Sequence, residues 1–226
     1  MFRPQTFSSL RHADFRYLWA GTFFMSAGQW IQQVTLGWLM YELTRSPVML
    51  GMMNGLRMLP FLVSSPLAGV AADRMDRRKL MLSTQWLLVV TAFLVGALAA
   101  SGLLQVWHLF AVTLITGIAW SFNEPVRQSV VPNIVPRDDL MNAVALNSMA
   151  FNTNKVLGPA LGGMFIAAFG AAGNFFVQGL AYGAVLVTIF WMSFPRNPVE
   201  ARRTSALANL KEGLAYVWST PTILLF

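Results

Sequence analysis

The chain has 226 residues, of which 56% are hydrophobic and 11% charged, and its formal net charge is +7. This composition excludes an ordinary soluble globular domain. The positive charge lies between apolar stretches, which favours anionic lipid headgroups over nucleic acid as its partner. The lack of cysteine excludes disulfides, thiol catalysis and cysteine metal sites.

Six stretches are long and apolar enough to cross a bilayer, which takes about 20 residues. They follow an amino terminus of residues 1–14 and cover approximately 15–41, 47–72, 80–101, 106–131, 140–169 and 174–192. The first is too long for a signal peptide and lacks a small-residue cleavage site, so we expect it to remain in the membrane. The predicted fold class is therefore an all-α membrane protein with a six-helix transmembrane bundle over 15–193.

The distribution of basic residues predicts the orientation of the bundle. Of the sixteen lysines and arginines, only Arg45 falls in a connection predicted to lie outside the cell. The excess of positive charge on the other side places the amino terminus in the cytoplasm, and six crossings return the chain to it. We therefore expect a multi-pass protein of the inner or plasma membrane.

The composition changes after the sixth span. Residues 194–221 form a polar linker, in which Leu207, Leu210, Leu214 and Trp218 recur at the spacing of an amphipathic helix on the cytoplasmic surface. Residues 222–226 resemble the first turn of a seventh span. We accordingly expect the chain to be the front part of a longer protein, with a self-sufficient six-helix protein as the alternative.

Two cations are predicted within the membrane, where a charged side chain costs at least about 2.5 kcal/mol. Arg57 lies ten residues into the second span. Either it faces a central cavity and attracts an anion, or it stabilises a kink by binding carbonyls exposed at Pro60. Lys155 lies in the fifth span and shares a helical face with Asn147 and Asn154. That face suits a wet cavity wall, although interhelical hydrogen bonding explains the asparagines equally well.

The first and fourth spans also carry polar stripes, whereas the third and sixth carry few polar residues. An aqueous path between four helices explains this difference. The predicted substrate cavity consists of Gln29, Gln33, Arg57, Thr116, Trp120, Asn147, Asn154 and Lys155.

Two motifs resemble signatures of the major facilitator superfamily. The connection after the second span carries Gly69, Asp73, Arg74, Arg77 and Arg78 at the spacing of the superfamily's loop between helices two and three. In the fifth span, a predicted packing and bending site resembles the Gly-Pro-x-x-Gly-Gly signature of its antiporters, and Pro60 is a second predicted bend. The residues of the fifth-span motif are Gly158, Pro159, Gly162 and Gly163.

Segments 57–60, 73–78 and 123–128 are most similar to the bacterial branch of enterobactin-exporter-like transmembrane secretion effectors. This resemblance implies two six-helix bundles with alternating access to a site between them. The chain would be the amino-terminal bundle, and a carboxy-terminal six-helix half would be its partner. The resemblance further implies a cytoplasmic latch made by Gly69, Asp73, Arg74, Arg77, Arg78, Glu124 and Arg127.

The expected function is a secondary active exporter of an amphipathic small molecule, such as a siderophore, drug or lipid-like metabolite. Proton coupling is implied by the resemblance alone, since Thr113 stands where many proton antiporters carry an arginine. The alternative is a non-transporting scaffold or a half-sized subunit that functions as a dimer. An enzyme is not expected because phosphate-loop, metal-ligand and serine–histidine–acid patterns are absent, and no cofactor is expected.

Overall fold

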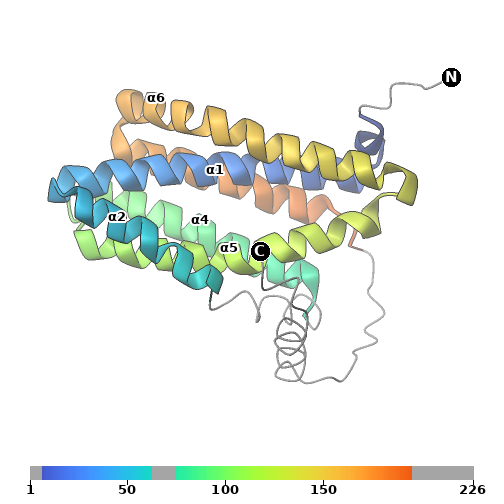
Figure 1. Cartoon of the computed structure of the whole chain (residues 1–226), viewed down its shortest axis with the longest axis horizontal. Helices are drawn as coiled ribbons and strands as arrows, with labels where there is room; N and C mark the ends of the chain where they lie inside the picture. Colours follow the sequence, from blue (N-terminus) through green and yellow to red (C-terminus); the bar gives the residue numbers. More distant parts are fainter. Residues whose placement is uncertain (1–6, 63–74, 195–226) are drawn as a thin grey trace, which may run out of the picture.

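The computed structural model describes residues 7–62 and 75–194. Within these ranges the chain is helical and contains no strand. The elements are η1 (Ser8–Arg11), α1 (Ala13–Thr44), α2 (Pro47–Leu56), α4 (Arg77–Ala100), α5 (Val106–Ile134) and α6 (Arg137–Trp191). The long helices lie side by side as a bundle (Figure 1).

Three of the described helices, α4, α5 and α6, are long and apolar enough to cross a membrane. Helix α1 has 32 residues, but Gln29, Gln32 and Gln33 lower its mean hydropathy. Helix α2 ends at Leu56, and the chain becomes helical again over 58–62. The rest of the predicted second span, most of the predicted linker and the predicted start of a seventh span lie outside the described residues.

The break at Arg57 follows from Pro60. Proline lacks the amide hydrogen that would bond to the carbonyl four residues earlier, so the helical ladder is interrupted there. Arg57 consequently sits at the end of α2, in a turn between two helical segments. Pro60 itself is buried, and a Cβ added at Gly117 of α5 would lie 2.8 Å from its Cγ.

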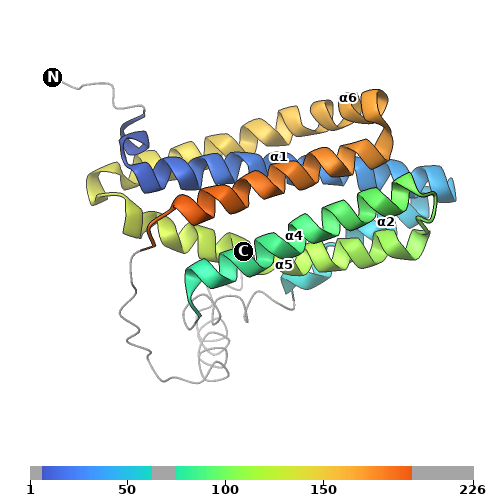
Figure 2. The ribbon, with the colours of Figure 1, turned by 180° about the vertical axis from the view of Figure 1, so that it is seen from behind.

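Helix α6 contains both the fifth and the sixth predicted spans. The chain reverses at Gly170, whose φ of 71° and ψ of 173° are accessible essentially only to glycine. The two limbs of α6 run antiparallel, and α1 lies along both of them (Figure 1 and Figure 2). The predicted connection between the two spans is therefore a single sharp turn.

Buried amides connect the helices. Asn174 of α6 donates to Thr35 Oγ1 of α1 at 2.6 Å, and Asn123 of α5 donates to Thr84 Oγ1 of α4 at 2.7 Å. Tyr182, which is fully buried, donates to Gln32 Oε1 at 3.3 Å. These bonds satisfy polar groups that would otherwise be costly in an apolar interior.

Candidate functional site

Two adjoining cavities lie among α1, α5 and neighbouring helices. The first, here called the Arg57 cavity, has a volume of about 30 Å³ and is lined by α1, α2, segment 58–62 and α5. The second, here called the large cavity, measures about 650 Å³ and also borders the first limb of α6. Gln29, Phe61 and Trp120 line both, so the two cavities meet at these three side chains.

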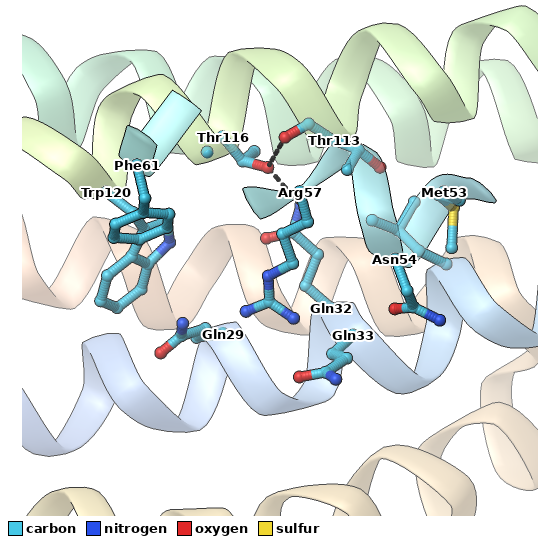
Figure 3. A pocket seen from close by; sticks show the side chains of 12 residues that line it. Gln29, Gln32, Gln33, Met53, Asn54, Arg57, Phe61, Thr113, Thr116 and Trp120 are labelled. Carbon is cyan, nitrogen blue, oxygen red and sulfur yellow. Dashed lines mark hydrogen bonds between the residues drawn. The ribbon is translucent and has the colours of Figure 1, made fainter. Parts of the chain in front are cut away.

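Arg57 is the charged centre of the smaller cavity. Its guanidinium points toward α1, between Gln29 and Gln33 (Figure 3). Behind it, Gln32 donates to Thr116 Oγ1 at 3.3 Å, and the Thr116 hydroxyl donates to Val112 O at 2.7 Å. None of the described residues that line this cavity is acidic. Among the described residues, the cavity therefore combines one positive charge that has no carboxylate beside it with amide and hydroxyl groups, a combination that suits an anion.

The large cavity has a mostly apolar wall with two charges near one end. Arg127 is 4% exposed, and its Nη1 donates to Leu18 O at 3.2 Å and to Thr22 Oγ1 at 3.1 Å. The Glu124 carboxylate instead accepts from Gln128 Nε2 at 2.9 Å. The two opposite charges therefore share the cavity wall without a direct ion pair within 4 Å.

The predicted latch residues lie in several places. Arg77 Nη1 donates to Ser129 O of α5 at 3.3 Å, and Arg78 Nη2 donates to Phe190 O of α6 at 3.1 Å. Arg127 binds the backbone of α1 rather than Glu124. Three of the predicted members, Gly69, Asp73 and Arg74, lie outside the described residues. A latch that operates as one unit therefore stays a prediction.

The predicted cavity residues on α6 do not all line a cavity. Asn147 borders the large cavity. Asn154 is 1% exposed and donates to Ser26 Oγ at 2.8 Å and to Phe23 O at 3.0 Å, so its amide joins α6 to α1. Lys155 is exposed and borders neither cavity. It follows Phe151 by four residues, and it therefore lies on the same side of α6 one turn further along.

Seven residues that line the Arg57 cavity were not among the predicted cavity residues, namely Gln32, Leu36, Met53, Asn54, Phe61, Thr113 and Gly117. Asn54 and Phe61 lie three residues before and four after Arg57, a spacing that places side chains on one helical face. That signal was present in the sequence. No such spacing pointed to Gln32, because Gln29 and Gln33 were sufficient to explain the polar stripe on the first span.

The predicted packing motif lies where α6 crosses α1. A Cβ added at Gly158 would lie 2.4 Å from Trp30 Cβ, and one at Gly162 would lie 3.4 Å from Ile31 Cα. Gly163 has no neighbour within 4 Å. Pro159 lies inside the helix beside Gly158. The two helices thus approach each other closely at Gly158 and Gly162.

A family model described as transmembrane secretion effector matches residues 4–225. The chain belongs to this family. Its relatives are transporters of the major facilitator superfamily, which are integral membrane proteins and not enzymes. The resemblance found in the sequence is therefore confirmed at the level of the family.

Several curated transport proteins are similar to the chain. An uncharacterised transporter of Bacillus subtilis, YfiS, is 27% identical over 209 residues, which are 88% of this chain and 48% of that protein. The staphyloferrin A transporter of Staphylococcus aureus is 28% identical over 170 residues, which are 74% and 42%. Macrolide efflux protein A of Streptococcus pyogenes is 23% identical over 203 residues, which are 89% and 50%.

A solved structure has the same fold. A POT family transporter in complex with a thioalcohol-conjugated peptide aligns with a TM-score of 0.69 and 14% identity, over 93% of this chain and 45% of that one. The chain thus spans about half the length of the curated relatives it matches.

Proposed function

We propose that this chain forms the amino-terminal six-helix bundle of a secondary active exporter that moves an amphipathic small molecule out of the cell by alternating access. The joined cavities around Arg57 are the observation that carries this proposal. They offer a membrane-embedded space with polar and apolar walls, as a transport site needs. The names of the staphyloferrin and macrolide relatives support a substrate of that kind.

The proposed orientation has the amino terminus in the cytoplasm. It is supported by the basic residues at the end of the bundle where Arg77 and Arg78 bind α5 and α6. The test is labelling of single cysteines with a membrane-impermeant thiol reagent. We expect Met75→Cys to react only from the cytoplasmic side and Ser101→Cys only from outside, and the reverse pattern would contradict the orientation.

The latch proposal has a physical basis in the same contacts. Arg77 and Arg78 bind backbone carbonyls of two other helices at one end of the bundle. Charges that form contacts in one rocking state and lose them in the other bias the equilibrium between those states. Coupling to protons is proposed from the family resemblance, and collapse of the proton gradient should then stop efflux.

The other wall of the transport path would come from a second six-helix half or from a second copy of this chain. The chain matches only about half the length of its curated relatives, and this supports the need for a second half that supplies the other wall. Cross-linking of differently tagged copies in membranes distinguishes the two, since only the dimer gives a mixed product.

The decisive variant is Arg57→Gln. The measurement is accumulation of radiolabelled staphyloferrin A and erythromycin in efflux-deficient bacterial cells that express the protein. We expect the unmodified protein to lower accumulation of at least one compound and Arg57→Gln to abolish that effect, at an equal amount of protein in the membrane. Unchanged efflux by the variant would contradict the role proposed for Arg57.

A further inference from the structure

The Arg57 cavity differs from the large cavity in both size and charge. We propose that the Arg57 cavity is a head-group site for a single small anionic group, such as a carboxylate or a phosphonate, while the large cavity holds the apolar body of the same molecule. This inference rests on the proposed function, because it names the substrate class of the exporter's own site.

The charge of the smaller cavity calls for an anion. Its described lining contains one guanidinium and the amides of Gln29, Gln32, Gln33 and Asn54, but no carboxylate. A cation without a partner is costly within a membrane. An anionic head therefore gains a charge-assisted bond from Arg57, and the amide NH₂ groups of the wall supply further donors.

The size of the smaller cavity limits the head to a small group. A volume of about 30 Å³ accommodates about two waters, since each needs about 10–15 Å³. The terminal oxygens of one carboxylate or one phosphonate occupy a comparable space, and a guanidinium binds either group through two parallel hydrogen bonds. The cavity thus favours a small anionic head over an extended one.

The large cavity suits the remainder of the molecule. Its volume of about 650 Å³ lies within the range of about 300–1,000 Å³ typical of small-molecule sites. Met25, Val144 and Phe151 contribute apolar wall, and the described charges, Glu124 and Arg127, are opposite in sign. A body without net charge is therefore preferred here.

The junction orients the molecule. Phe61 and Trp120 line both cavities, and Figure 3 shows them together on one side of Arg57. A molecule that occupies both cavities passes these two side chains, with its head at Arg57 and its body in the large cavity. The predicted ligand is consequently an acid whose anionic group extends from a larger apolar group.

Binding to the full chain in lipid nanodiscs tests this assignment by isothermal titration calorimetry. The probes are naphthylacetate and three matched compounds: the neutral naphthylacetamide, the cationic naphthylethylamine and naphthylmethylphosphonate. We expect the carboxylate and the phosphonate each to bind at least about tenfold more tightly than the amide and the amine, which lack a charge-assisted bidentate contact. Equal binding of the amide would overturn the anion site.

Two variants locate the site. Arg57→Gln should abolish the preference for the acid over the amide, whereas Arg45→Gln removes the same charge at an exposed position outside both cavities and should retain it. Asn54→Asp, at an exposed position of α2, adds a carboxylate to the wall without a change of size. It should lower affinity for the acid about tenfold and raise that for the amine. An unchanged preference in both Arg57→Gln and Asn54→Asp would place the head elsewhere.

The binding readout also separates this inference from the proposed function. Tight, Arg57-dependent binding of the acid by a protein that moves no substrate would overturn the exporter and support the head-group site. Efflux by a protein that does not distinguish the acid from the amide would overturn the head-group site alone.

Discussion

Buried asparagine side chains fix both limbs of α6 against α1, with Asn154 on the first limb and Asn174 on the second. The Asn154 amide donates to Ser26 Oγ and to Phe23 O, and Asn174 donates to Thr35 Oγ1 and to Gly162 O. Interhelical hydrogen bonds of this kind contribute about 0.6–2 kcal/mol each within membranes. Since Gln29 and Gln33 lie on the same α1, these bonds also hold the wall that faces Arg57.

The close approach of α6 to α1 depends on Gly158. We expect Gly158→Ala to destabilise the bundle by about 1–3 kcal/mol, the range for overpacked cores, because the new Cβ would lie 2.4 Å from Trp30 Cβ. Gly163→Ala is the matched control: it lies in the same motif and has no neighbour within 4 Å. The measurement is thermal unfolding in detergent. Equal melting temperatures for the two variants would contradict this packing.

Much of the Arg57 cavity was predictable from the sequence because charge and helical spacing are local properties. Arg57 was identified by its cost in lipid, and Gln29, Thr116 and Trp120 by their shared faces; the structure gathers all four around one cavity. Asn154 has the same spacing but bonds to α1. Periodicity shows which side of a helix is polar, and it does not show whether a neighbouring helix or water satisfies that side.

Arg127 illustrates the same limit. The family resemblance places it, together with Glu124, in the predicted cytoplasmic latch. In the structure its Nη1 reaches the carbonyl of Leu18 in α1. Which of two acceptors a long side chain chooses depends on how the helices pack, and a stretch of sequence does not contain that information.

Helix ends depend on turn chemistry. Between α4 and α5 the chain leaves the helix over 101–105, where Gly102 has a φ of 71°, and the expected spans end at 101 and resume at 106. Two differences have backbone causes. Pro60 interrupts the second span at Arg57, and Gly170 replaces the expected loop between spans five and six with one turn.

The reversal within α6 provides a prediction for this element. Gly170→Ala should destabilise the protein by about 1–3 kcal/mol, because the φ of 71° and ψ of 173° lie in a region that alanine adopts only under strain. Gly183→Ala lies in the second limb of α6, where nothing is within 4 Å of the new methyl group. Gly183→Ala should be neutral or slightly stabilising, since alanine favours helix. Thermal unfolding of both variants checks this, and a Gly170→Ala protein as stable as the unmodified one would show that the turn tolerates a side chain.

At the scale of the whole molecule, the cavities are located where four helical segments meet. Helix α1 supplies glutamines, α5 supplies threonine and tryptophan, α2 ends just before Arg57, and the first limb of α6 closes the large cavity. Helix α4 and the second limb of α6 contribute none of the described lining residues. This division agrees with the polarity of the predicted spans, in which the third and sixth carried few polar residues.

The proposed aqueous path has one further consequence, which concerns the exposed side chains of α6. Lys155 follows Asn152 by three residues and Phe151 by four, so it continues the side of α6 that borders the large cavity. Val156, which is 73% exposed, is turned away from that side by about 100°. We therefore expect Lys155 to face water and Val156 to face lipid.

Single cysteines distinguish these surroundings, and the 226 residues contain no other cysteine. A thiol reacts with a charged methanethiosulfonate reagent as the thiolate, which forms in water and not among acyl chains. Lys155→Cys should accordingly react at least about tenfold faster than Val156→Cys, and near the rate of Ser148→Cys, which borders the large cavity. Two results would contradict this prediction: equal rates for Lys155→Cys and Val156→Cys, or slow reaction of both variants while Ser148→Cys reacts fast. Either result would place Lys155 against lipid and limit the aqueous path to the two cavities.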